Sequence, residues 1–337
     1  MPRETATMRD VAEHAGVSVQ TVSYVVNQTG SISDETRDRV LRSIEALNYR
    51  RNPIARSMRT RKTGLIALVV MDITNPVLSK IASSIESAAY ERGYNVLLYN
   101  TGLNASRESV YLNEIGDRRA DGVIIINAID RQNAADLKAE HVPAVLIDCP
   151  SPNSPIPTVS VDNFQGAYAA TQYLIDLGHR RIAHIAGAAG LEIARQREAA
   201  YLSALDDAGL HYRNVISAQN IQWGYESGYN AMRELLDADA RPTAVFAASD
   251  ELAIGAYRAI AESGLRIPQD ISVVGFDNIE ASAYTTPPLT TVHQPFADLG
   301  IEALTLLLEM LYKDNSEVSS VLLPAQLVIR ESTAEAT

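Results

Sequence analysis

The strongest constraint on the fold is an alternation that begins at Gly64, where short apolar runs are separated by amphipathic stretches. The apolar runs span 65–71, 95–99, 122–126 and 144–147, and the stretches between them span 76–92, 106–119 and 131–141. Runs of this length predict buried strands, and the longer stretches predict helices. A strand–helix–strand series predicts a parallel sheet that is covered by helices on both faces.

A second series of the same kind follows in the sequence. Strands are expected at 181–186, near 215–218, at 244–248 and at 271–276, with helices at 165–177, 194–208, 224–236 and 251–263. The proline-rich stretch 149–158 predicts a loop that leads to a short strand. Two series in succession predict two similar subdomains with a cleft between them.

The first 47 residues differ, because they predict three short helices. Thr7 and Asp10 form a capping-box pair for the first helix, Ser18 caps a second over 19–26, and Ser33 caps a third that ends near Leu47. In the third helix we expect these side chains to point inward: Val40, Leu41, Ile44 and Leu47. The small and branched residues Ala12, Gly16, Val22 and Val25 have the spacing of a helix-turn-helix. The alternative interpretation is a small helical cap on a larger domain.

If this segment binds DNA, the second helix enters the major groove with its first residues toward the base edges. Those residues are Val19, Gln20 and Tyr24. The amide of Gln20 can pair with adenine, and Val19 can contact a thymine methyl group. Contacts to phosphates, or capping contacts, are expected from Thr21, Ser23 and Asn27.

A basic segment, residues 46–62, follows these helices. It carries six Arg or Lys residues and no acidic residue, although the whole chain has a net charge of −12. Asn52 and Pro53 form a helix start signal, but the helix would be too short to be stable alone in water. A basic helix that forms only on DNA fits this pattern, with Met58 as a wedge in the minor groove. The alternative is a solvated linker between domains.

Composition and missing motifs exclude other classes. The lone Cys149 excludes an intrachain disulfide, and neither the start of the chain nor any apolar run predicts an export signal or a membrane span. The six His residues are scattered, and no dinucleotide-binding loop, phosphate-binding loop or nucleophile elbow occurs. We therefore expect a cytoplasmic protein that is not an enzyme and that uses no metal and no cofactor.

Polar and aromatic residues follow the predicted strands, at the edge where α/β sheets bind ligands. The expected ligand-binding residues are Ile73, Asn75, Asn127, Asp148, Arg197, Trp223, Ser249, Asp277 and Gln294. Charged side chains can each bind adjacent hydroxyl groups, and Trp223 offers a flat face to a sugar ring, so the set suits a polyol. Each residue also has a structural alternative: Asp250 as a helix cap, Arg197 as a surface residue, Trp223 as a loop-packing residue.

The segments TMRDVAEHAGVSVQTVSYVVN and SISDETRDRVLRSIEALNYRRNPIARSMRTRKTGLIALV resemble the DNA-binding head and hinge of the LacI/GalR family of bacterial repressors. The body resembles the family's periplasmic-binding-protein-like sensor domain through NPVLSKIASSIESAAYERGYNVLLYNT, ASDELAIGAYRAIAESGLRIPQDISVVGFDN and PPLTTVHQPFADLG. The resemblance implies a small all-α helix-turn-helix domain followed by a two-subdomain α/β fold of type I. It implies DNA contacts from Thr7, Ser18, Val19, Gln20, Thr21, Ser23, Tyr24, Asn27, Asn52, Ala55, Arg56, Met58 and Arg59.

The resemblance also has departures. Many members carry Arg where this chain has Tyr24, which cannot make the same contact with guanine, so their operator preferences do not transfer. In the family, the residues matching Arg197 and Asp277 grip the effector. Ala200 stands where a Gly is usual, and Val77 stands where an aromatic residue is common, which argues against a purine ligand.

These inferences define an expected organisation. Residues 1–50 form the headpiece, 51–62 the hinge, and 63–337 the effector-binding and dimerisation domain, with subdomain 1 at 63–161 and 293–321 and subdomain 2 at 162–291 and 323–337. The resemblance places chain crossings near Asp162, Thr291 and Leu322. The expected function is a homodimeric repressor of carbohydrate-utilisation genes that a mono- or disaccharide releases from double-stranded operator DNA. The alternatives are a solute-binding transport receptor and a regulator with a purine or nucleoside co-repressor.

Overall fold

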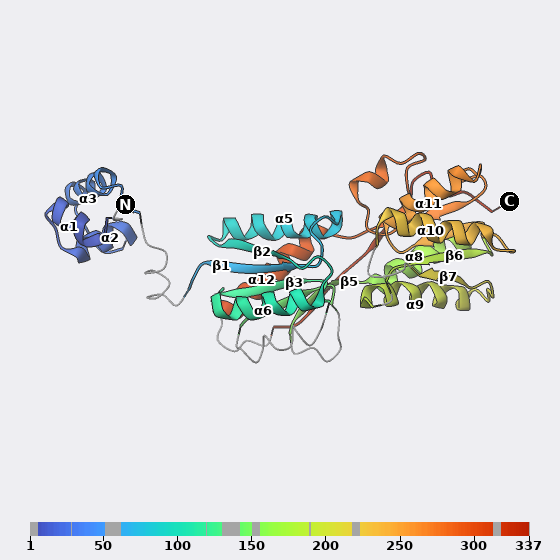
Figure 1. The fold of residues 1–337 in the computed structure, drawn as a ribbon, viewed down its shortest axis with the longest axis horizontal. Helices are drawn as coiled ribbons and strands as arrows, with labels where there is room; N and C mark the ends of the chain where they lie inside the picture. Colours follow the sequence, from blue (N-terminus) through green and yellow to red (C-terminus); the bar gives the residue numbers. More distant parts are fainter. Residues whose placement is uncertain are drawn as a thin grey trace. The chain divides into compact units, whose positions relative to one another are not determined.

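The structure is a computed structural model that describes residues 6–27, 29–50, 62–118, 120–129, 142–149, 156–188, 190–217, 223–312 and 318–336. The chain forms two compact units, residues 1–63 and 64–337 (Figure 1). The expected hinge residues Asn52, Ala55, Arg56, Met58 and Arg59 lie outside the described residues, as does the helix expected at 131–141. None of the described helices is both long enough and apolar enough to cross a membrane.

The first unit contains three helices, α1 (Met8–Ala15), α2 (Val19–Asn27) and α3 (Asp34–Ala46). The capping box of α1 is present, since Thr7 and Asp10 bond reciprocally, and Gly16 ends the helix with a left-handed φ of 63°. Ser18 accepts a hydrogen bond from the Thr21 amide, and Ser33 accepts one from the Thr36 amide. The three helices predicted from capping and periodicity are therefore confirmed.

The small core of this unit differs from the prediction at one residue of α3. Val11, Ala12, Ala15, Val22, Val25 and Val40 form the buried cluster, with Ile44 and Leu47 packed against it. Leu41 is 49% exposed, so its predicted inward position is wrong. Val40 and Ser43 occupy the inward face instead, and Ser43 bonds to His14 Nδ1 at 3.0 Å, so this face includes a polar residue.

The second unit begins with lobe 1, which is built on a parallel sheet of order β11-β5-β4-β3-β1-β2. The strands are β1 (Leu65–Val70), β2 (Asn95–Asn100), β3 (Gly122–Ile126), β4 (Ala144–Ile147), β5 (Thr158–Val161) and β11 (Val321–Leu323). The helices of the lobe are α5 (Pro76–Glu91), α6 (Ala105–Arg118) and α12 (Phe296–Tyr312). In β1, Ile66, Leu68 and Val70 pack with α5 and α12, whereas Ala67 and Val69 pack with α6, so helices cover both faces (Figure 1).

Strand β2 corrects one expectation. The sequence predicts a buried strand here, but β2 lies at the edge of the sheet, and Leu97 and Leu98 are exposed. An apolar run alone does not distinguish an edge strand from a central one, because the difference depends on which neighbours the tertiary structure supplies.

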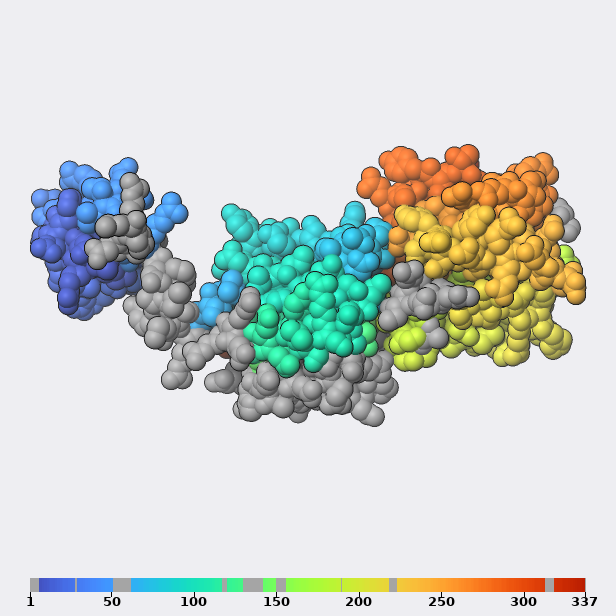
Figure 2. Space-filling model, in the orientation of Figure 1, coloured from blue at the N-terminus to red at the C-terminus, as the bar shows by residue number. Residues whose placement is uncertain are grey.

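Lobe 2 is built on a four-stranded parallel sheet of order β7-β6-β8-β9. Its strands are β6 (Ile182–Ala186), β7 (Asn214–Ser217), β8 (Ala244–Ala247) and β9 (Ser272–Val274). Helices α8 (Asn163–Asp176) and α9 (Glu192–Asp207) pack in one core cluster with this sheet, and α10 (Tyr225–Asp237) and α11 (Asp250–Glu262) pack in another. The predicted α/β architecture with two similar halves is confirmed, and Figure 2 shows the two lobes as separate masses in contact.

The chain passes between the lobes at three places. It leaves β5 for α8, returns from β10 (Thr291–His293) to α12, and leaves β11 for β12 (Gln326–Val328), which pairs antiparallel with β10. Val292 and Leu327 pack in the core of lobe 2, whereas Leu323 packs against the core of lobe 1. Three segments of the chain thus connect the lobes, an arrangement that permits hinge motion around a cleft.

Candidate effector-binding site and DNA-binding face

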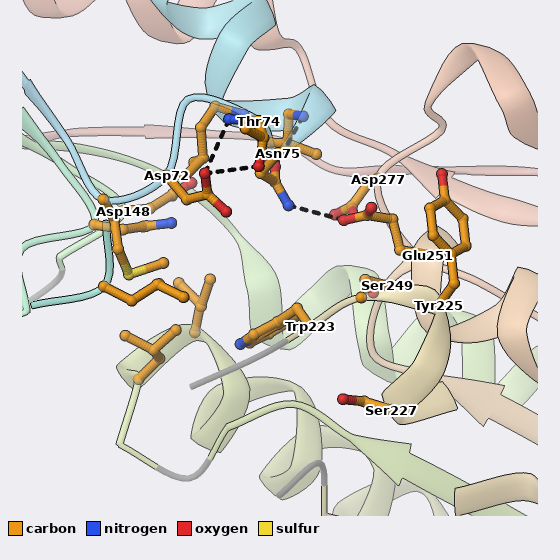
Figure 3. Close-up of a pocket in the computed structure, with 18 of the residues that line it drawn as sticks. Asp72, Thr74, Asn75, Asp148, Trp223, Tyr225, Ser227, Ser249, Glu251 and Asp277 are labelled. Carbon is orange, nitrogen blue, oxygen red and sulfur yellow. Dashed lines mark hydrogen bonds between the residues drawn. The ribbon is translucent and has the colours of Figure 1, made fainter. Parts of the chain in front are cut away.

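A cavity of about 500 Å³ lies between the two lobes of the second unit (Figure 3). Eight of the nine residues proposed from the sequence line it: Asn75, Asn127, Asp148, Arg197, Trp223, Ser249, Asp277 and Gln294. Lobe 1 supplies side chains after β1, β3 and β4, and lobe 2 supplies them from α9 and from the ends of β8 and β9. The volume is within the usual range for small-molecule sites, about 300–1,000 Å³.

The ninth residue, Ile73, is not among the residues that line the cavity. Its side chain packs against the core of lobe 1, and its amide donates to Asn100 Oδ1 at 3.2 Å. An apolar residue in a loop after a strand gains more free energy from burial against that core than from exposure in a polar cavity.

The backbone is strained at several places around the cavity. Leu103, Asn127, Asp148 and Asp277 line it, and each has a positive φ between 52° and 118°. Non-glycine residues adopt such angles at a cost, and these conformations concentrate at binding sites. Asp148 follows β4 and Asp277 follows β9, so two of these conformations occur just after strands that end at the cavity.

Arg197 is the buried cation of the site. It lies in α9, its side chain is only 2% exposed, and its Nε donates to Asn163 Oδ1 at 2.8 Å. One terminal nitrogen donates to the Ala248 carbonyl at 2.5 Å and to Asp277 Oδ1 at 3.5 Å. The surface-residue alternative for Arg197 is therefore wrong. Burial lowers the pKa of this guanidinium, and the neighbouring carboxylates oppose that shift.

Two buried carboxyl groups lie near Arg197. Burial raises the pKa of Asp148 to about 6, and the Val161 amide and Arg197 partly offset this effect. Burial likewise raises the pKa of Asp277 to about 6, with Arg197 and Gln294 acting in the opposite direction. Both groups are thus costly to keep charged and are poised to accept hydrogen bonds from a ligand.

Two amide oxygens in the cavity wall have no hydrogen-bond partner among the described residues. They are Asn127 Oδ1 and Gln294 Oε1, on side chains that are 8% and 1% exposed. Gln294 Nε2 donates to Asp277 Oδ1 at 2.5 Å, which fixes the amide orientation and leaves the oxygen as the free atom. Buried acceptors without partners are uncommon, and at the wall of a cavity they indicate a ligand that donates hydrogen bonds.

Trp223 supplies the flat surface of the cavity. It precedes α10, lies 5.6 Å from the Arg197 guanidinium measured to the ring centroid, and its indole Nε1 has no partner among the described residues. The ring packs so closely on Gly187 that a Cβ there would lie 2.3 Å from a ring carbon. Gly187 therefore fixes the ring, while Arg197 interacts with one of its faces.

Asn75 and Ser249 have a second role as helix caps. Asn75 Oδ1 accepts from the Val77 and Leu78 amides at the start of α5, and Ser249 Oγ accepts from the Leu252 amide at the start of α11. The predicted cap, Asp250, instead accepts from the Ile279 amide at 2.8 Å and the Thr291 hydroxyl at 2.5 Å, so its carboxylate ties α11 to β10.

Several lining residues were not predicted from the sequence. The polar ones are Asp72, Tyr225, Glu226, Ser227 and Glu251. Asp72 lies two residues after the end of β1, so the strand-end argument that selected its neighbours could have found it. Glu251 lies in the first turn of α11, where a carboxylate is usual for electrostatic reasons alone, and its position gives no signal of a site.

In the first unit, the predicted DNA-binding residues lie on α2 and the segments before α1 and α2. Val19 and Tyr24 are exposed, and Gln20 Nε2 donates to the Tyr24 hydroxyl at 2.8 Å. Ser18 and Thr21 bond to each other, and Asn27 bonds to Ser23. Thr7 caps α1. The polar groups of this face are held in order by neighbours on the same helix.

The geometry defines a class of protein, a two-lobed small-molecule-binding body that follows a helix-turn-helix unit. Residues 7–52 match the family of bacterial regulatory proteins, lacI family, and residues 171–333 match the periplasmic binding protein-like domain. The chain is 38% identical over 332 residues to the HTH-type transcriptional repressor PurR of Pasteurella multocida (strain Pm70), covering 97% of this chain and 98% of the relative. The chain belongs to the lacI family.

Solved structures agree with this assignment. The lac repressor dimer bound to operator and the anti-inducer ONPF has a TM-score of 0.90 and 33% identity, over 98% of this chain and 100% of that one. The complex of the transcriptional regulator CelR with cellobiose has a TM-score of 0.73 and 33% identity, over 97% and 99%. The protein is therefore a DNA-binding transcriptional regulator with an effector-binding domain, and it acts by binding rather than by catalysis.

Proposed function

We propose that this regulator is a repressor of carbohydrate-utilisation genes, acts in the cytoplasm, and leaves its operator when a mono- or disaccharide binds. The observation that best supports this proposal is that one cavity of about 500 Å³ is lined by Asp148, Arg197, Asp277 and Trp223. Charged groups that bond adjacent hydroxyls, beside an aromatic face, are the chemistry that a sugar ring requires. The similarity to the CelR–cellobiose complex supports the same ligand class.

The proposed division of labour follows the two units. Residues 1–50 read the operator, 51–62 form the hinge on DNA, and the remainder binds the effector and a second copy of the chain. One reading helix supplies few base contacts, so specific affinity favours a dimer on two half-sites. The likeness to the lac repressor dimer supports a homodimer, and the exposed Leu97 and Leu98 on the edge strand β2 supply apolar surface for contact.

The proposed mechanism couples the cleft to the hinge. A ligand that contacts both lobes favours the conformation in which it has the most contacts, and the lobes rotate about the three crossing segments. In the dimer this rotation displaces the lobe 1 copies relative to each other and melts the paired hinge helices. A coupling free energy of about 1–3 kcal/mol is sufficient for the switch.

The test is a thermal-shift screen of mono- and disaccharides on the full chain, with ribose, purines and nucleosides as comparison ligands. A sugar that raises the melting temperature is then added to a gel shift with operator DNA. We expect release of DNA and a change in the fluorescence of Trp223, the single tryptophan of the chain. Stabilisation by a purine or nucleoside alone would contradict the sugar assignment, and tighter DNA binding would reverse the sign of the response.

A further inference from the structure

The negative charge of the cavity wall bears on which kind of sugar binds there, neutral, anionic or cationic. The inference drawn from it rests on the proposed sugar-binding function. The described residues that line the cavity carry five carboxyl groups and one guanidinium; the carboxyl groups belong to Asp72, Asp148, Glu226, Glu251 and Asp277. The guanidinium of Arg197 is already shared with Asp277, Asn163 and the Ala248 carbonyl. An anionic ligand such as a sugar phosphate would therefore meet a net negative wall.

The free hydrogen-bonding groups of the wall are mainly acceptors, which fits its negative charge. Asn127 Oδ1 and Gln294 Oε1 are buried acceptors that lack partners among the described residues, and the carboxylates are acceptors whenever they are ionised. A ligand that satisfies this wall must bring N–H or O–H donors. A hydrogen bond with an ionised donor or acceptor is about twice as strong as one between neutral groups, and an ammonium donor adds the attraction of opposite charges to its bond with a carboxylate.

Two of the carboxylates line the cavity from different lobes, and in Figure 3 Asn75 lies between them. Asp72 follows β1 in lobe 1, and its Oδ1 accepts from the Thr74 amide at 3.0 Å and the Thr74 hydroxyl at 2.8 Å. Glu251 lies in the first turn of α11 in lobe 2, and its Oε2 accepts from Asn75 Nδ2 at 2.9 Å, a bond that itself joins the lobes. These bonds leave the second oxygen of each carboxylate available to a ligand.

The pKa of Glu251 responds to its burial and to the negative charges near it. Burial, with Asp277 and Asp72 as the neighbouring negative charges, raises the pKa of Glu251 to about 7. A neutral ligand leaves this repulsion in place near pH 7, whereas a cation between the two groups removes it and draws the lobes together.

We propose that the effector is an amino sugar whose ammonium group binds between Asp72 and Glu251, while its ring lies against Trp223. The ring hydroxyls donate to Asp148, Asn127 and Gln294. The ammonium thereby couples ligand charge to cleft closure, since its two carboxylate partners belong to different lobes. Asn75 positions Glu251 for this contact.

The test is titration calorimetry on the full chain with three amino sugars and their neutral parents. Glucosamine, galactosamine and mannosamine are compared with glucose, galactose and mannose, and glucose 6-phosphate serves as the anionic probe. We expect at least one amino sugar to bind about 10-fold or more tightly than its parent, a difference of about 1.4 kcal/mol. Glucose 6-phosphate should bind more weakly than glucose.

The variants Asp72→Asn and Glu251→Gln keep the size of each side chain and one acceptor oxygen, but they remove its charge and replace the second oxygen by an NH2 donor. Each should reduce the amine preference, the ratio of amine affinity to parent affinity measured on the same variant, about 10-fold, a difference of about 1.4 kcal/mol. The matched control is Glu234→Gln, which removes one charge from an exposed position of α10 and should leave the preference unchanged. Melting curves of each variant verify that it is folded.

The outcomes separate the two proposals. Equal binding of amine and parent, or a preference that both charge-removing variants retain, overturns the amino-sugar inference and leaves the sugar proposal standing. Binding of purines or nucleosides with no sugar bound overturns both.

Discussion

The DNA-binding face and the effector cavity are built in opposite ways. The face of α2 lies within a continuous run of nine residues, and its predicted functional side chains are exposed or half-buried and bond mainly to one another. The cavity collects residues from Met71 to Gln294, and its central groups are buried. A local, exposed site can lose a side chain without loss of stability, whereas a buried, assembled site couples binding to folding.

The largest expected effect concerns Arg197. Arg197→Ala should abolish the effector response, and it should also destabilise the second unit by about 3–5 kcal/mol, because Asp277 is left buried without its partner. Chemical denaturation and a gel shift with effector measure the two effects. Arg195→Ala is the matched control, since Arg195 lies on the same helix but is about half exposed. A folded Arg197→Ala protein that still responds to effector would remove this residue from the site.

The second prediction concerns the pH dependence of stability at Asp148. Its folded pKa of about 6 lies above the ordinary value of 3.8, so its contribution to stability is fully present below about pH 3.8 and is lost as the pH rises through 6. Asp148→Asn should therefore be more stable than the unchanged protein at pH 8, by up to about 3 kcal/mol, and the difference should shrink toward pH 5. The Asn carbonyl can still accept from the Val161 amide.

Urea unfolding at pH 5, 6, 7 and 8 measures this difference, with the exposed Asp239→Asn as control. The control should show no pH-dependent gain. A constant difference between Asp148→Asn and the unchanged protein across the range would contradict the assignment of a raised pKa to this buried carboxyl.

The smallest expected effect concerns the exposed face. Gln20→Ala should cost about 1–3 kcal/mol of operator discrimination, because its amide has the hydrogen-bonding groups that can pair with adenine and is proposed to read a base. The free energy of unfolding of the headpiece should change by less than about 0.5 kcal/mol, since the Tyr24 hydroxyl can bond to water instead. Fluorescence anisotropy with operator and with unrelated DNA measures the first quantity. An equal loss of affinity for operator DNA and for unrelated DNA would contradict a base-reading role for Gln20.

The sequence-based predictions are accurate for features that depend on neighbouring residues in the chain, and less accurate for features that depend on tertiary contacts. The caps Thr7, Ser18 and Ser33 act over three residues and were identified from spacing alone. Leu41 was misplaced because a helical period leaves about one residue of uncertainty in which face turns inward. The buried strand expected at 95–99 proved to be an edge strand, because a run of apolar residues does not encode the number of its neighbours.

The sequence by itself determined the two-unit plan, the parallel sheets and most of the residues at the strand ends, since each depends on local periodicity, capping and the direction of parallel strands. Only the tertiary structure decided that Arg197 is buried beside Asp277, that Gln294 keeps an acceptor free, and that Asp72 and Glu251 lie on the same cavity. The reason is physical: burial, partner choice and pKa shifts depend on distances between groups that are far apart in the chain, and only packing sets those distances.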